Sequence, residues 1–277
     1  MPNIEYRFAG WSDHFTDWGP FLSLASPKAC RMSSVLKTKD LQVVHRLNPM
    51  SLTFQSGSLI AIIGPNGSGK STFLQAISGL LSYDGEVIWN GFNLNDIPVY
   101  QRAQQLAWVG PEPNFQFPFT VQEVLRMGRF ARGEDIHNLE PYLKDMDLVS
   151  LADRPITQIS TGEKQRTLLA RAMVTQAPIQ CWDEPLSSLD IRHQLEILMK
   201  ARAMADAGAT ILISLHDLRV AHCMDQVVLL DQGNLIACGS PAQVLTPALL
   251  RQVFGVLSRE SMGLVLELPP NIEVHKG

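Results

Sequence analysis

The chain has 277 residues, 45% of them hydrophobic, enough to build the core of one large domain or two modest ones. Its 27 acidic residues slightly outnumber its 23 basic ones, and the basic residues form no stripe that would follow a nucleic-acid backbone. The longest purely apolar runs have strand length, far below the roughly 20 residues that cross a bilayer, so we expect neither a membrane span nor a nucleic-acid partner.

The first 31 residues differ from the rest of the chain. Tryptophan, aspartate and proline residues interrupt any periodic pattern, and the apolar stretch 21–24 is too short for the hydrophobic region of a secretory signal. We expect residues 1–31 to be a poorly structured leader, with Met32 as a plausible true start.

The four cysteines lie far apart, at Cys30, Cys181, Cys223 and Cys238. They show neither the close pairing of a zinc site nor the density of a disulfide scaffold. This pattern is typical of a protein of the reducing cytoplasm.

Short β-like runs surround one glycine-rich loop in the first part of the chain; they are 52–54, 58–63 and 85–89. The Asn90-Gly91 pair that follows predicts a tight hairpin turn. Residues 70–80 have helical spacing, with Phe73, Leu74, Ile77 and Leu80 on one face. The order strand, glycine loop, helix is the context that a phosphate-binding loop requires.

The second half of the chain alternates between helical and strand-like segments. Residues 121–151 have helical spacing and predict a helical insert. Strand-like runs return at 179–182, 210–215 and 227–230, separated by helix-length stretches such as 191–207. This alternation predicts an α/β fold with a parallel, doubly wound sheet.

The glycine-rich loop matches the P-loop pattern, whose backbone N–H groups turn inward around phosphates. It consists of Gly64, Pro65, Asn66, Gly67, Ser68, Gly69, Lys70, Ser71 and Thr72. We expect Lys70 to reach the β- and γ-phosphates of ATP and Ser71 to ligate Mg²⁺. The helix that opens at Lys70 would point its positive end at the anion.

An acidic pair ends the strand-like run 179–182. We expect Asp183 to hold Mg²⁺ and Glu184 to polarise the attacking water. Taken alone, such a pair is more often a solvated turn. The P-loop upstream reverses that preference.

A third motif opens a helix at Ser160, with Gly162 and Glu163 close behind. By itself such a motif is more often a simple helix N-cap beside a glycine. Its neighbours decide the interpretation.

Taken together, these motifs resemble those of ABC ATPases over about residues 35–255. The matching features, in family order and spacing, are the P-loop, Ser-x-Gly-Glu-x-Gln-Arg from Ser160, Asp183-Glu184-Pro185, Ser188-Leu189-Asp190 and His216-Asp217. The resemblance implies a P-loop NTPase core with a RecA-like parallel sheet, an antiparallel β subdomain and a helical insert at about 112–165. The domain would span 32–255, and a tail would follow at 256–277.

The resemblance also implies how ATP is bound and hydrolysed. Two copies pair head to tail, and each ATP lies between the P-loop of one copy and the region Ser160–Glu163 of the other. Ser160 and Gly162 contact the γ-phosphate, Asp190 takes part in contacts between the subunits, and His216 occupies a switch position near the γ-phosphate. Without the resemblance, His216 would read as a buried structural histidine.

One position departs from the family pattern in a place that matters for metal binding. The family normally has glutamine after the strand at 106–109, whereas this chain has Pro111. Proline has no side-chain oxygen for Mg²⁺, so we expect altered coupling between ATP binding and the helical insert. Glu112 or Gln116 would substitute if the loop shifts.

A second departure concerns the adenine base. The family usually places an aromatic residue upstream of the P-loop, whereas this chain offers Val43, Val44 and His45. Either His45 stacks on the base or Val44 makes an apolar contact.

Three short segments, 117–129, 239–247 and 46–51, are similar to the importers of ferric siderophores, haem and cobalamin. The last segment favours cobalamin, with haem and ferric siderophores as alternatives. The partners implied are two transmembrane permease subunits and an external binding protein, with the ATPase peripheral on the cytoplasmic face of the inner membrane. Phe115, Phe117 and Phe119 either form the docking surface for the permease or pack inside the insert.

Two other classes compete with this interpretation. A soluble ABC ATPase without a transport role would be favoured by a second cassette, a long coiled coil or a basic face, and the sequence has none of these. A low-turnover regulatory subunit is suggested by Pro111, but Lys70, Asp183, Glu184 and His216 are all present and favour hydrolysis.

Overall fold

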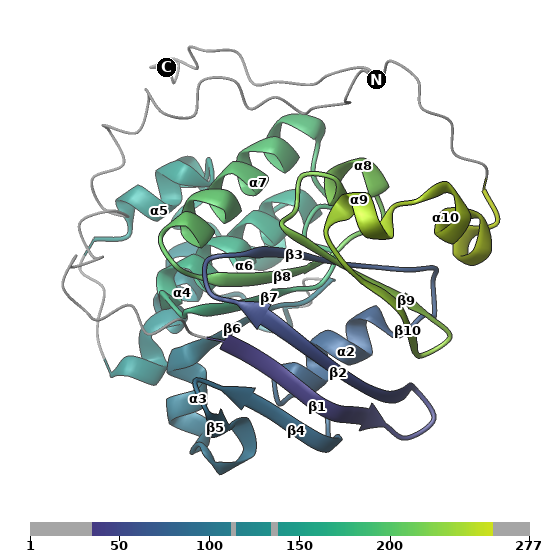
Figure 1. Ribbon diagram of the computed structural model, residues 1–277. Coiled ribbons are helices and arrows are strands. Elements are labelled where there is room, and N and C mark those ends of the chain that lie inside the picture. The colour runs from purple at the N-terminus through teal and green to yellow at the C-terminus, as the bar shows by residue number, and fades with distance from the viewer. Residues whose placement is uncertain (1–34, 112–114, 134–137, 257–277) are drawn as a thin grey trace.

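A computed structural model describes residues 35–111, 115–133 and 138–256 (Figure 1). The expected leader 1–31 and all but the first residue of the expected tail 256–277 lie outside the described residues. Within the described part of the chain, no helix combines the length and the apolar character needed to cross a membrane.

The larger sheet has the strand order β10-β9-β3-β8-β7-β6. Its strands are β3 (Leu59–Ile63), β6 (Leu106–Val109), β7 (Ile179–Trp182), β8 (Thr210–Ser214), β9 (Gln226–Asp231) and β10 (Asn234–Gly239). All neighbouring strands run parallel except β10, which is antiparallel to β9. The predicted parallel sheet is therefore confirmed.

A smaller antiparallel sheet has the strand order β2-β1-β4-β5. Its strands are β1 (Val35–Val43), β2 (Leu47–Gln55), β4 (Asp84–Trp89) and β5 (Phe92–Asn93). Trp89 pairs with Phe92 across Asn90 and Gly91, whose φ angles of 49° and 85° are left-handed. The predicted Asn-Gly hairpin is confirmed, because these two residue types tolerate that conformation.

The helices cover the larger sheet on both faces (Figure 1). They are α2 (Lys70–Ile77), α3 (Val99–Gln105), α4 (Val121–Arg126), α5 (Glu140–Asp145), α6 (Thr161–Thr175), α7 (Ile191–Asp206), α8 (Leu218–Ala221), α9 (Pro241–Val244) and α10 (Pro247–Phe254). Short 3₁₀ helices occur at η2 (Leu94–Asp96), η3 (Met127–Arg132), η4 (Val149–Leu151) and η5 (Ile156–Gln158). The described helices between β6 and α6 lie within the predicted helical insert.

Two hydrophobic cores lie on opposite faces of the larger sheet, because strand side chains alternate between faces. Ile60 and Ile62 of β3 join the core that α2 shares with the antiparallel sheet. Leu59, Ala61 and Ile63 join the core formed with helices α4–α7. The central strands are therefore buried on both sides, as expected of a parallel sheet covered by helices.

One helix is shorter than its spacing predicted. We expected 70–80 to be helical with Leu80 on the buried face, but α2 ends at Ile77 and the Leu80 side chain is 58% exposed. Ser78 donates its hydroxyl to the Leu74 carbonyl, and Gly79 adopts a φ of 68° that ends the helix.

Candidate functional site

The order of the parallel strands brings the predicted motifs to one edge of the sheet. The P-loop follows β3, His216 follows β8 by two residues, and the acidic pair Asp183 and Glu184 follows β7. Because β3, β8 and β7 are neighbours, their carboxyl ends lie side by side. This is the edge at which open α/β sheets bind ligands.

The P-loop backbone can be built only with glycine at two of its positions. Gly64 and Gly69 have φ angles of 153° and 104°. A Cβ at Gly64 would lie 2.1 Å from the Leu230 carbonyl oxygen, and one at Gly69 would lie 2.5 Å from a Leu47 methyl carbon. At Gly67, by contrast, a Cβ would meet open space, so the loop is closely packed at Gly64 and Gly69 but open at Gly67.

The side chain of Lys70 is folded back over the loop that precedes it. Its buried ammonium donates hydrogen bonds to the carbonyls of Gly64, at 2.9 Å, and Pro65, at 3.0 Å. Burial lowers the pKa of Lys70, and the carboxylates of Glu184 and Asp183 oppose that shift. A cation held here can exchange two carbonyl partners for phosphate oxygens.

The two carboxylates of the acidic pair stand in different surroundings. Asp183 is fully buried, and its Oδ1 accepts a hydrogen bond from the Ser214 hydroxyl at 2.6 Å. The same hydroxyl accepts a hydrogen bond from the Glu184 backbone N–H at 2.7 Å. Ser214 thus holds both residues, and sequence reasoning missed it, although a hydroxyl inside the apolar run 211–215 was a usable signal.

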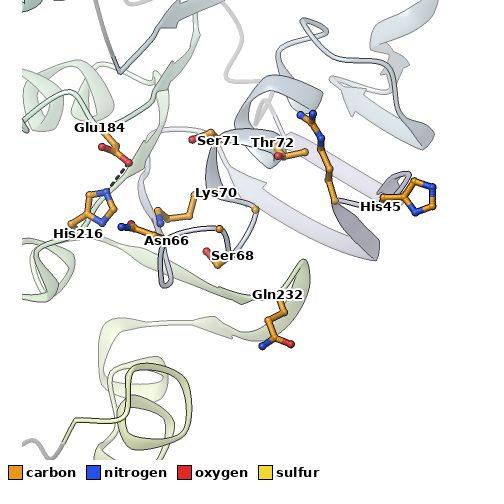
Figure 2. Close-up of a pocket in the computed structure, with 12 residues that line it drawn as sticks. His45, Asn66, Ser68, Lys70, Ser71, Thr72, Glu184, His216 and Gln232 are labelled. Carbon is orange, nitrogen blue, oxygen red and sulfur yellow. Dashed lines mark hydrogen bonds and ion pairs between the residues drawn. The ribbon is translucent and has the colours of Figure 1, made fainter.

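Glu184 and His216 face one another beside Lys70 (Figure 2). Glu184 Oε1 and His216 Nε2 are 2.6 Å apart, and the two side chains are 30% and 46% exposed. Glu184 has a left-handed φ of 48°, an uncommon conformation for a residue other than glycine. A carboxylate paired with an imidazole at a solvent-accessible edge can orient and polarise a water molecule.

These groups line one pocket of about 920 Å³. Its lining residues are His45, Arg46, Asn66, Gly67, Ser68, Gly69, Lys70, Ser71, Thr72, Glu184, His216 and Gln232. The structure therefore brings together most of the predicted P-loop with Glu184 and His216. It adds Arg46 and Gln232, neither of which was predicted as a site residue, although Arg46 opens the segment 46–51 named above; the Gly233 backbone N–H, next to Gln232, donates to Ser68 O at 3.0 Å.

Other predicted site residues lie outside the lining of this pocket. Ser160 caps α6, with its hydroxyl accepting from Glu163 N, while the Glu163 carboxylate accepts from Ser160 N at 2.7 Å. Asp190 caps α7 without such a box: its carboxylate accepts from His193 N at 2.9 Å. The N-cap interpretation of the Ser160 motif is thus confirmed, and its contact with nucleotide across a dimer remains a prediction.

Asp183 and Ser71 provide the oxygen ligands that Mg²⁺ prefers. Asp183 Oδ2 is buried and, among the described residues, has no hydrogen-bond partner. The described residues include no cluster of three or more histidine, cysteine or acidic side chains that would hold a metal by protein ligands alone. One carboxylate and one hydroxyl fit a Mg²⁺ ion that takes its other ligands from phosphates and water.

The two departures from the expected pattern have different outcomes. His45 lines the pocket, at its far end in Figure 2, whereas Val44 is 66% exposed and is not among the lining residues. Pro111 is partly buried and lies two residues after the end of β6. Of its possible substitutes, Gln116 is exposed and Glu112 lies outside the described residues.

The predicted aromatic segment divides between surface and core. Phe117 and Phe119 are 65% and 41% exposed, and their rings lie 6.1 Å apart. Phe115 is partly buried against the core that contains α4–α7. Two of the three rings are thus available to a partner.

Comparison with known proteins extends these observations. The family model described as "ABC transporter" matches residues 47–187, about half of the chain. A hemin import ATP-binding protein, HmuV, of Mesorhizobium japonicum is 38% identical, over 76% of this chain and 88% of the relative. The HmuV protein of Rhizobium etli is 39% identical, over 77% and 86% of the two chains.

Solved structures of similar fold include an ATP-binding subunit of an ABC transporter, with a TM-score of 0.71 and 28% identity over 81% of this chain and 95% of that one. Another is the cassette MJ0796 as a dimer in a post-hydrolysis state with ADP and Pi, with a TM-score of 0.68 and 25% identity over 74% and 98% of the chains. The ABC ATPase fold predicted from the motifs is confirmed. This chain belongs to the ABC transporter family and is one of its ATP-hydrolysing subunits.

Proposed function

We propose that this chain energises the import of haem, as one of two identical ATPase subunits docked peripherally on two permease subunits at the cytoplasmic face of the membrane. The contact that carries the proposal is the 2.6 Å pair of Glu184 and His216 facing Lys70 in the pocket. An external binding protein would deliver the cargo.

The relatives change the cargo that we expected from the sequence. The brief similarity of residues 46–51 favoured cobalamin. The relatives that are 38% and 39% identical over three quarters of the chain are named for hemin import, a longer similarity. We therefore place haem first, with cobalamin and ferric siderophores as the alternatives that an uptake experiment separates.

In the proposed mechanism, each residue of the pocket has one task. Lys70 leaves the Gly64 and Pro65 carbonyls and binds the terminal phosphates of ATP. Ser71 and Asp183 would hold Mg²⁺, which neutralises charge on the phosphates. Glu184 polarises the attacking water, and His216, which meets Glu184 through Nε2, would turn that nitrogen to donate a hydrogen bond to the γ-phosphate when ATP is bound.

The second copy would complete the site. Ser160 and Gly162 of one subunit would contact the γ-phosphate held by the other, with Glu163 fixing Ser160 in place and Asp190 at the subunit contact. ATP would then close the dimer, and hydrolysis would reopen it. The loop at Pro111 and the exposed Phe117 and Phe119 would transmit this motion to the permease.

The test is uptake of labelled haem, cobalamin and ferric siderophore in cells that lack this gene, with wild type, Glu184→Gln or Lys70→Ala restored. We expect wild type alone to restore haem uptake, because both variants lose hydrolysis. Rescue of cobalamin or siderophore uptake instead would reassign the cargo.

A steady-state ATPase assay on the purified proteins tests the enzymatic part separately. The wild type should exceed Lys70→Ala clearly. Turnover no higher than that of Lys70→Ala would support the alternative of a regulatory nucleotide-binding subunit, which the proline at position 111 suggests.

A further inference from the structure

Four polar side chains, two of them carboxylates, form a continuous chain from the loop before α7 to helix α6. Asp190 contacts His193 on the first turn of α7, His193 faces Asp147 after α5, and Asp147 faces Arg166 of α6. Three separate segments are thereby connected, and none of these contacts is used by the pocket around Lys70.

His193 is the centre of this chain. Its Nδ1 lies 2.9 Å from both carboxylate oxygens of Asp190, and its Nε2 lies 4.0 Å from Asp147 Oδ2. The imidazole is only 18% exposed, whereas the two carboxylates are 67% and 79% exposed. The ring is therefore packed in place and presents one nitrogen to each acid.

The far end of the chain is anchored in the protein. The buried Arg166 donates to the Met146 carbonyl at 2.7 Å and to the Asp147 carbonyl at 3.2 Å, and lies 3.5 Å from the Asp147 carboxylate. Asp147 has a left-handed φ of 53°. Arg166, six residues after Ser160, thus fixes the turn that contains Asp147.

The same two segments also touch directly. A Cβ at Gly162, in the first turn of α6, would lie 2.9 Å from the Ser188 carbonyl oxygen in the loop that leads to Asp190. The glycine therefore permits a close approach between the start of α6 and this loop. His193 supports the other side of the loop through the Asp190 carboxylate.

We propose that His193 is a positioning residue that holds the loop 186–190 in register with the start of α6. The two segments would then be presented as one rigid surface to the ATP of the second copy. This inference rests on the proposed function, because the surface matters only if the chain forms an ATP-dependent dimer.

Loss of this positioning role should reduce ATP-driven dimerisation rather than the stability of the fold. Both carboxylates that His193 contacts are largely exposed, and contacts with exposed carboxylates contribute little to folding. Ordering two segments before they meet a partner, however, lowers the entropic cost of association. Loss of the imidazole should therefore weaken the closed dimer more than it weakens the fold.

The test introduces His193→Ala, His193→Asn and His193→Gln into the Glu184→Gln protein, in which ATP should accumulate the closed dimer. The asparagine amide stands near the place of Nδ1 and keeps the Asp190 contact, whereas the glutamine amide stands near Nε2 and keeps only the Asp147 contact. His222→Ala removes an exposed histidine elsewhere and is the matched control. ATP-driven dimerisation is measured by analytical ultracentrifugation, and nucleotide affinity of the monomer with a fluorescent ATP analogue.

We expect His193→Ala to weaken dimerisation roughly tenfold, the scale of coupling between contacting residues, with monomer affinity unchanged. His193→Asn should recover part of the loss, His193→Gln less, and the control should match the parent. Dimerisation of His193→Ala equal to the parent, or an equal loss of monomer affinity, would overturn the proposal. If the parent Glu184→Gln protein itself fails to dimerise with ATP, the proposed function fails first and this inference with it.

Discussion

At the scale of single residues, the two adjacent carboxylates of the site, Asp183 and Glu184, have different surroundings. Asp183 is buried and held by the Ser214 hydroxyl, which leaves its second oxygen for a metal ion. Glu184 is 30% exposed and pairs with His216, where water can reach it. One serine fixes both positions, because its hydroxyl donates to Asp183 and accepts from the Glu184 backbone.

Replacing Ser214 with alanine should therefore impair both stability and catalysis. The change leaves Asp183 Oδ1 and the Glu184 N–H without their partner, which costs about 1–3 kcal/mol of unfolding free energy. Because Asp183 is the proposed metal ligand, kcat should fall about 10- to 100-fold.

Thr210→Val is the matched control for this experiment. Thr210 is buried at the other end of β8, and its hydroxyl donates to the Gln55 carbonyl at 3.3 Å, away from the pocket. We expect it to lower the melting temperature without lowering kcat. If Ser214→Ala also leaves kcat unchanged, Ser214 has no positioning role.

At the scale of secondary-structure elements, α4 and α6 begin with the same kind of capping box, completed by a glutamate. Thr120 caps α4 with Glu123, and Ser160 caps α6 with Glu163. In both boxes the carboxylate accepts from the cap N–H at 2.7 Å, and the cap hydroxyl accepts from the third N–H at 3.3 Å. The two boxes differ in their proposed role, because only Ser160 would contact nucleotide.

Comparing variants of the two boxes distinguishes the effect of losing a helix cap from the effect of losing a nucleotide contact. Ser160→Ala and Thr120→Ala should each lower the unfolding free energy by about 1 kcal/mol, the usual value of an N-cap. Only Ser160→Ala should also reduce ATPase activity at saturating ATP. Equal activities of the two variants in the steady-state assay would leave Ser160 as a helix cap without a catalytic role.

At the scale of the whole molecule, carboxylates at helix starts couple stability to pH. Hydrogen bonds from backbone N–H groups lower the pKa of Glu123, Glu163 and Asp190 below the ordinary values of 4.5 and 3.8. Such groups stabilise the fold fully above the unfolded-state pKa, and this contribution is lost as the pH falls through the folded-state pKa. Asp145 acts in the opposite direction, because burial raises its pKa.

We therefore expect the unfolding free energy to decrease as the pH falls below about 4.5. Urea unfolding midpoints at pH 7, 5, 4 and 3.5 measure this. Glu123→Gln is the control, because glutamine also completes a capping box but does not titrate; its midpoint should fall less between pH 5 and 3.5. A midpoint that rises on acidification would show that Asp145 and other buried groups dominate.

The sequence by itself determined the local features of this protein. The glycine spacing from Gly64 to Gly69 predicted the P-loop, since positive φ and close packing admit no side chain at those ends. Asn90-Gly91 predicted its hairpin for the same reason. Apolar runs and helical spacing predicted β3, β4, β7, β8 and β9 together with α2, α4, α5, α6 and α7, because burial of one face is encoded locally.

Only the tertiary structure decided which distant residues meet. The strand order β3-β8-β7 places the P-loop, His216 and Glu184 at one edge, and it brings Ser214 against the Asp183 carboxylate and the Glu184 backbone. The chain from Asp190 through His193 to Asp147 depends on how α7 packs beside the end of α5. Except for the pair Asp190 and His193, these contacts join residues that lie tens of positions apart, so the local spacing of residue types does not encode them. They are set by the packing of the two cores on the central sheet.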